Sequence, residues 1–192
     1  ALAKDDSVGA VVLFIDSGGG AASAAEAMTS ALEALAKKCP VVVYMNTVAA
    51  SGGYYVATAG RWIVAQPGTI TGSIGVTVGK PITNDLFERL KVNRYDFTRG
   101  RNVNILSDRV PFDDSQRDIM RHLIEQDYAL FLQRVSDARG MTPEAVDVVG
   151  GGRVWTGEQA LNHGLVDELG GFSAALKRAR DYADLPEHAP II

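Results

Sequence analysis

The chain has few of the residues and runs that mark several classes of protein. It contains one cysteine, Cys39, so no disulfide can form within it. Its longest apolar run, residues 8–15, is far shorter than the roughly 20 residues that cross a bilayer. Residues 1–7 hold no apolar core of a signal peptide. We therefore expect neither a disulfide framework nor a membrane span within these residues.

Positive charge is also scarce. The net charge is −4 and the Lys and Arg residues are scattered, which argues against a nucleic-acid partner. Hydrophobic residues make up 46% and charged residues 22%, which is ordinary for a globular protein. A chain of this length can bury a real core, so we expect residues 1–192 to form a single domain. Because an apolar strand begins almost at once, we expect this domain to be part of a longer protein.

Strands and helices alternate in the predicted secondary structure. Apolar runs predict strands at residues 8–15, 41–45 and 62–65, the first covered on both faces because its run is continuous. Helical spacing and capping residues predict helices over residues 24–35, 54–59, 86–90, 114–139, 143–149, 157–163 and 173–182. This order predicts an α/β fold, with a mostly parallel sheet and flanking helices.

A glycine-rich turn at residues 17–20 follows the first predicted strand and precedes a helix. Backbone amides at such a turn can point at a negative charge, and glycines let a substrate backbone approach closely. The turn lacks the G-x-G-x-x-G spacing and is not followed by Gly-Lys-Ser/Thr, which disfavours a nucleotide site. A tight turn without any ligand remains the alternative.

A second turn of small residues contains Ser51. Two alanines precede this serine and two glycines, Gly52 and Gly53, follow it. A serine so placed between a strand and a helix exposes its hydroxyl as a nucleophile, with the next amide at the oxyanion. Taken alone, Ser51 is equally well interpreted as a helix N-cap. The two turns together favour catalysis, because ligands bind where the strands of a parallel sheet end.

No base for this serine is evident. Each of the three histidines lies in a polar segment or at a helix end: His122, His163 and His188. A lysine acts as a base near neutral pH only if burial lowers its pKa from about 10.4 to roughly 7–8. Lys80, which precedes a proline, is the one weak candidate after Ser51.

Four separated motifs, in order along nearly the whole chain, resemble one family. They are "VVLFIDSGGG", "AASGGYYVATAG", "PGTITGSIGV" and "GRVWTGEQALNHGLVDELGG". These stretches are similar to the signal peptide peptidase A (protease IV) family, whose relatives have the Clp protease and crotonase folds. The resemblance implies a Clp protease/crotonase-like fold. It also implies that Ser51 is the nucleophile and that Gly19 or Gly20, with the Gly52 amide, forms the oxyanion hole. Ser73 matches a serine that hydrogen-bonds the catalytic lysine.

The sequence departs from the family pattern at three positions. Asp16 and Gly18 stand where the family usually has asparagine and proline, and neither change removes an oxyanion amide. Val103 falls where single-repeat members carry the catalytic lysine. Long members take lysine from a first repeat and serine from a second. The resemblance therefore implies the second, C-terminal repeat of a Ser/Lys endopeptidase, inactive alone because its base lies outside this chain.

The resemblance also implies partners and a compartment. We expect peptide substrates such as cleaved signal peptides, a ring-like homo-oligomer, and a membrane-anchored parent protein on the extracytoplasmic face of a bacterial membrane. We expect no cofactor and no metal. Two alternatives stay open: a crotonase-type acyl-thioester enzyme, which would need catalytic carboxylates, and a non-catalytic assembly repeat.

Overall fold

The computed structural model describes residues 4–192. They form two compact units. The sheet unit comprises the described residues up to Gly75 together with Tyr128–Ile192, and the insert unit comprises Val76–Asp127. The organisation of the chain as a single domain stays a prediction. None of the helices in the described part has both the length and the apolar character that a membrane crossing needs.

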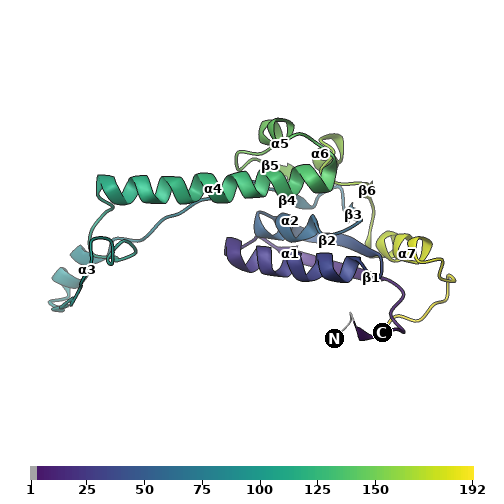
Figure 1. The fold of residues 1–192 in the computed structure, drawn as a ribbon, viewed down its shortest axis with the longest axis horizontal. Helices are drawn as coiled ribbons and strands as arrows, with labels where there is room; N and C mark the ends of the chain where they lie inside the picture. The colour runs from purple at the N-terminus through teal and green to yellow at the C-terminus, as the bar shows by residue number, and fades with distance from the viewer. Residues whose placement is uncertain (1–3) are drawn as a thin grey trace. The chain divides into compact units, whose positions relative to one another are not determined.

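The sheet unit contains most of the regular structure (Figure 1). Its elements are β1 (Val11–Ser17), α1 (Ala22–Ala36), β2 (Val41–Ala50), α2 (Gly52–Ala57), β3 (Trp62–Ala65), β4 (Ile70–Gly72), α5 (Pro143–Val149), β5 (Val154–Thr156), α6 (Gly157–Asn162), β6 (Glu168–Leu169) and α7 (Phe172–Tyr182). The insert unit contains α3 (Asn84–Arg89), and the long helix α4 (Asp114–Arg139) begins there and ends in the sheet unit.

These bounds confirm the predicted helices, since each lies at or within three residues of its expected limits. The Thr142 hydroxyl accepts a hydrogen bond from the Ala145 amide, so the expected cap of α5 is present. The sequence did not predict β4, β5 and β6. Strands of three and two residues are too short to show the alternation by which a strand is recognised.

Strand β2 is the centre of the sheet, whose order is β5-β4-β2-β3-β6 with β1 also paired to β2. It runs parallel to β1, β3 and β4, and β6 runs parallel to β3. The pair β4 and β5 is antiparallel. The sheet is therefore mixed, and mostly parallel as predicted.

The core lies on both faces of β2, because alternate side chains of a strand point in opposite directions. On one face, Val43 and Met45 join a cluster with α1, α2 and the end of α4. On the other, Val42 and Tyr44 pack against α7. Val41, Val42, Val43 and Met45 are completely buried, as expected for a strand covered by helices on both sides.

The prediction that the first strand is covered on both faces is wrong. Among the described residues β1 pairs with β2 alone, so it is an edge strand. Its pattern is mostly half-buried, and Phe14 leaves 53% of its surface exposed. An apolar run shows which side chains a strand is able to bury. The position of the strand in the sheet decides which of those side chains are covered by other elements.

Candidate active site

Ser51 joins the end of β2 to the start of α2 in a strained backbone conformation. Its φ of 52° and ψ of −120° are rare for a residue other than glycine, and such strain typically costs about 1–3 kcal/mol. The Ser51 amide donates to the Gly72 carbonyl at 2.9 Å, and its carbonyl accepts from the Tyr55 amide at 2.8 Å. The Ser51 hydroxyl makes no capping hydrogen bond, so its side chain does not cap α2. The geometry is that of a sharp strand-to-helix turn that presents a nucleophile.

The two glycine turns are in direct contact beside Ser51. A Cβ atom on Gly19, whose φ is 103°, would lie 2.6 Å from the Gly52 nitrogen and 2.8 Å from the Ser51 Cβ. A Cβ atom on Gly52 would lie 3.1 Å from the Gly20 nitrogen. Only glycines allow so close an approach. The structure therefore brings Gly19, Gly20 and Gly52 together at Ser51.

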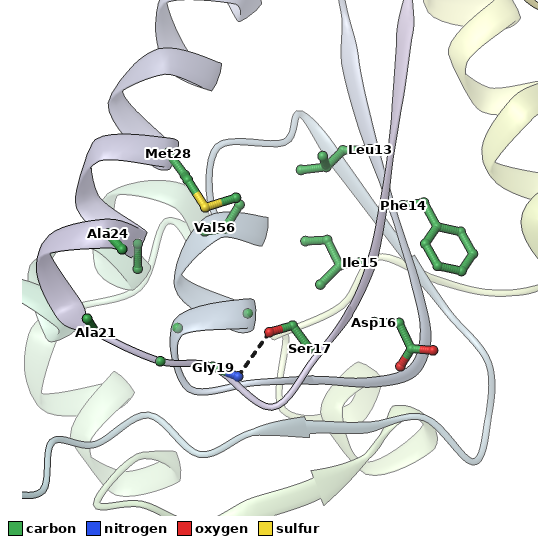
Figure 2. Close-up of a pocket in the computed structure, with 14 residues that line it drawn as sticks. Leu13, Phe14, Ile15, Asp16, Ser17, Gly19, Ala21, Ala24, Met28 and Val56 are labelled. Carbon is green, nitrogen blue, oxygen red and sulfur yellow. Dashed lines mark hydrogen bonds between the residues drawn. The ribbon is translucent and has the colours of Figure 1, made fainter.

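The amides of these glycines differ in what they bind. The Gly19 N–H donates to the Ser17 hydroxyl at 3.2 Å, which closes the first turn (Figure 2). Within the described residues, the N–H groups of Gly20 and Gly52 donate to no protein acceptor. Two unused amides beside a half-buried serine match what an oxyanion hole requires. Of the alternatives Gly19 and Gly20, this geometry favours Gly20 as the donor from the first turn.

Ser73 lies at the corresponding point of the neighbouring strand. Ala50 of β2 pairs with Gly72 of β4, so Ser51 and Ser73 directly follow two paired residues. Ser73 has a φ of 50°, and its amide donates to the Arg153 carbonyl at 2.7 Å. Its hydroxyl has no hydrogen-bond partner in the part of the chain that the structure describes. Both serines thus stand at one edge of the sheet.

An apolar groove of about 320 Å³ opens beside the glycine turns. Its wall is made by the β1 side chains Leu13 and Ile15, by Met28 of α1 and by Val56 of α2. Figure 2 shows these four side chains facing one another between the two helices and β1, whereas Phe14 points away. Small residues at the start of α1 and the glycines of both turns complete the lining. An extended chain with aliphatic side chains fits such a surface.

A polar network anchors α2, the helix that follows Ser51. The Tyr55 hydroxyl donates to Glu26 of α1, which also forms an ion pair with Arg134 of α4. Arg134 reaches Glu33 as well, at 2.8 Å. Burial, and then the hydrogen bond to Glu26, raise the pKa of Tyr55 to about 12. The phenol therefore stays protonated and donating at neutral pH, which holds α2 against α1.

A second anchor of α2 is the fully buried Tyr54, whose hydroxyl donates to the Leu165 carbonyl at 2.8 Å. Burial raises the pKa of Tyr54 far above its ordinary value. Nearby, Arg139 and Asp167 form a largely buried ion pair at 2.6 Å, and Asp167 also accepts from the Ile63 amide at 2.7 Å. These contacts tie the base of α2 to β3 and to the end of α4.

Two of the candidate bases, Lys80 and His163, have local partners. Lys80 belongs to the insert unit, where its ammonium donates to the Ile105 carbonyl at 3.0 Å and lies 4.4 Å from the Phe112 ring centre. His163 stacks on Trp155 at a centroid distance of 4.2 Å. Val103, which the resemblance aligns with the lysine of single-repeat members, is in the insert unit and is 58% exposed.

The sequence analysis did not identify two threonines whose hydroxyls bind main-chain carbonyls of β2 in the segment before Ser51. Thr71 is fully buried and its hydroxyl donates to the Ala49 carbonyl at 2.7 Å. Thr69 donates to the Asn46 carbonyl at 2.5 Å. The signal was available, because both are polar residues next to apolar ones in the segment after the third strand. Their partners became apparent only from the pairing of β2 with β4.

Comparisons with known proteins identify relatives of this chain. The profile described as "Peptidase family S49" matches residues 33–186. A chloroplastic serine protease SPPA of Arabidopsis thaliana is 36% identical over 178 residues, which are 92% of this chain and 26% of that protein. Protease 4 of Salmonella typhi is 39% identical over 185 residues, 95% of this chain and 30% of that protein. The chain thus spans less than a third of the length of these two relatives.

A likeness to a solved structure concerns the fold. A mutant of ClpP1 from Listeria monocytogenes superposes with a TM-score of 0.56 at 16% sequence identity. The match covers 86% of this chain and 75% of that one. It confirms the predicted Clp protease-like fold, with the crotonase-type arrangement of sheet and flanking helices.

Proposed function

Because the chain belongs to peptidase family S49, as the four sequence motifs had indicated, we propose that it carries the serine half of a Ser/Lys endopeptidase site. The observation that carries this proposal is the contact between the two glycine turns at Ser51. It puts a hydroxyl and the free amides of Gly20 and Gly52 at the mouth of an apolar groove.

The proposed reaction is acyl transfer to Ser51 and then to water. The Ser51 oxygen bonds to the scissile carbonyl carbon while its proton passes to a lysine amine. The carbonyl oxygen gains negative charge, which the Gly20 and Gly52 N–H groups stabilise. When the C–N bond breaks, the lysine returns the proton to the departing amine. Water then hydrolyses the ester, which releases the acid and restores the serine. One such oxyanion donor contributes about 10²–10³-fold to kcat in serine proteases.

The lysine is proposed to come from outside this chain. Val103 stands where single-repeat relatives have lysine, and the relatives described above are more than three times longer than the matching region. In this proposal Ser73 accepts a hydrogen bond from the incoming lysine amine, because the Ser73 hydroxyl is unpaired among the described residues. The parent protein would then assemble its site from two repeats, in a homo-oligomer anchored at the extracytoplasmic face of a bacterial membrane.

The groove supports apolar peptides as substrates. Leu13, Ile15, Met28 and Val56 offer hydrocarbon surface, and the glycines offer main-chain amides to an extended chain. Remnants of cleaved signal peptides have this character. Asp16 is the one charged residue among those that line the groove.

A fluorophosphonate probe tests the proposal in the complete protein. Attack by Ser51 forms an O–P bond and expels fluoride, so peptide mapping should find the label on Ser51. Ser51→Ala should fold normally and lose the label, since the side chain is small and lies at a turn. Ser73→Ala should slow labelling without removing it. A folded complete protein that takes no label would favour the assembly-repeat alternative.

A further inference from the structure

Strand β2 is irregular just before it reaches Ser51. Its register with β1 runs from Ile15 opposite Met45 directly to Ser17 opposite Ala49. One residue of β1, Asp16, therefore faces the three β2 residues at positions 46–48. Such a bulge leaves main-chain groups without their ladder partners and bends the strand. It also marks the place where β2 leaves β3 and begins to pair with β4.

Side chains fill the bulge from both sides. Asp16 accepts a hydrogen bond from the Val48 amide at 3.1 Å through Oδ1, and from the Asn46 side-chain amide at 2.8 Å through Oδ2. From the opposite side, the Thr69 hydroxyl donates to the Asn46 carbonyl. Figure 2 shows the Asp16 carboxylate pointing away from the groove, although its backbone lines it. The Asp16 carboxylate thus binds hydrogen-bond donors of β2 and does not face a substrate in the groove.

We propose that Asp16 is a positioning residue for Ser51, which rests on the proposed role of Ser51 as nucleophile. Ser51 lies five positions after Asn46, and between them the one residue paired in the β1–β2 ladder is Ala49, opposite Ser17. A shift of the register by one residue would move Ser51 by about 3.3 Å along the strand. Misplacement of a reacting group by even 1 Å can lower a rate about 10²-fold. The bulge therefore has to be held in one register.

A carboxylate matches this position because both of its partners are donors. The Asn46 amide is oriented by Gln66, which donates to the Asn46 Oδ1 at 3.4 Å and to the Tyr44 hydroxyl at 2.6 Å. Asn46 therefore turns its NH₂ group toward Asp16. An asparagine at position 16 would keep the bond from Val48 but oppose one NH₂ group with another.

This donor pattern leads to an exchange experiment in the complete protein. The measured quantities are kcat and KM for a peptide substrate and the rate of fluorophosphonate labelling at Ser51. Asp16→Ala should lower kcat and the labelling rate about 10–100-fold with little change in KM. Asp16→Asn should give an intermediate loss. Asn46→Asp alone should be as damaging as Asp16→Ala, because two carboxylates would face each other.

The double variant Asp16→Asn with Asn46→Asp restores a donor facing an acceptor and keeps the net charge. It should recover most of the lost rate. If Asp16 acted only as a negative charge that stabilises the fold from position 16, moving that charge to position 46 would not restore the rate. Asp181→Ala, which removes an exposed carboxylate on α7, is the matched control and should leave kcat unchanged. Thermal unfolding shows whether each variant is folded at the assay temperature.

The outcomes separate this proposal from the one it rests on. The first outcome assumes that the wild-type protein is labelled at Ser51. If a folded Asp16→Ala or Asp16→Asn variant is then labelled at the wild-type rate, Asp16 has no positioning role. The same conclusion follows if the exchanged pair recovers nothing although it is as stable as wild type. If Ser51→Ala labels as well as wild type, the proposed nucleophile itself is wrong.

Discussion

Replacing Gly19 with alanine tests the contact between the two turns directly. The new Cβ would lie 2.6 Å from the Gly52 nitrogen, 2.8 Å from the Ser51 Cβ and 3.0 Å from the Ala50 carbonyl oxygen. None of these atoms belongs to the far end of a flexible side chain, so relief requires the turns to move apart. The φ of 103° adds strain, because an L-residue avoids it.

The magnitude follows from these two terms. Backbone strain of this kind costs about 1–3 kcal/mol, and forcing an extra methyl group into a packed contact costs about 1–3 kcal/mol. We therefore expect Gly19→Ala to lower the free energy of unfolding by about 2–6 kcal/mol, a large part of the 5–15 kcal/mol typical of a domain. In molecules that remain folded, the Gly20 and Gly52 amides should separate, and labelling of Ser51 should fall by at least about 10²-fold.

The neighbouring glycine supplies the control. A Cβ on Gly18 would meet nothing within 4 Å, and its φ is not in the left-handed region. Gly18→Ala should therefore unfold and label like wild type. Urea unfolding and fluorophosphonate labelling of the two variants, side by side in the complete protein, give the comparison. Equal stability and equal labelling of Gly19→Ala and Gly18→Ala would refute the inferred contact between the turns.

Three further predictions concern the surroundings of the site. Arg139→Met leaves the largely buried Asp167 carboxylate without its ionic partner and should lower the free energy of unfolding by about 1–3 kcal/mol in urea titrations; an unchanged free energy of unfolding would show that the pair does not stabilise the fold. Met28→Ala enlarges the groove, so the ratio of kcat/KM for substrates with large over small apolar side chains should rise, while an unchanged ratio would show that substrates bind elsewhere. The hydrogen bond from Tyr55, and then Arg134, lower the pKa of Glu26 in the folded protein. Its stabilising effect is therefore present above the ordinary glutamate pKa and is lost as the pH falls through the lower, folded value. Glu26→Gln should flatten this acid-side decline in stability, and an unchanged decline would assign it to other carboxylates.

Local patterns were sufficient for the helices and for the three longer strands. The strand at residues 62–65 and the helices at residues 114–139 and 143–149 have the predicted bounds. Each is defined by residues close in sequence, through an apolar run, a helical period or a cap. The mostly parallel sheet was also predictable, because strands that alternate with helices need crossover connections. The exposure of Phe14 was not, since it depends on what lies beside β1 rather than on β1 itself.

The candidate site was likewise predictable from the sequence only in part. The sequence by itself determined which residues bring the chemistry, namely a serine among small residues and two glycine turns, each after a strand that ends at the same sheet edge. Only the tertiary structure decided that Gly19 touches Ser51 and Gly52 and that Asp16 holds the bulge. The physical reason is that these contacts join segments about 30 residues apart. Their distances depend on strand register and twist, which no single segment encodes.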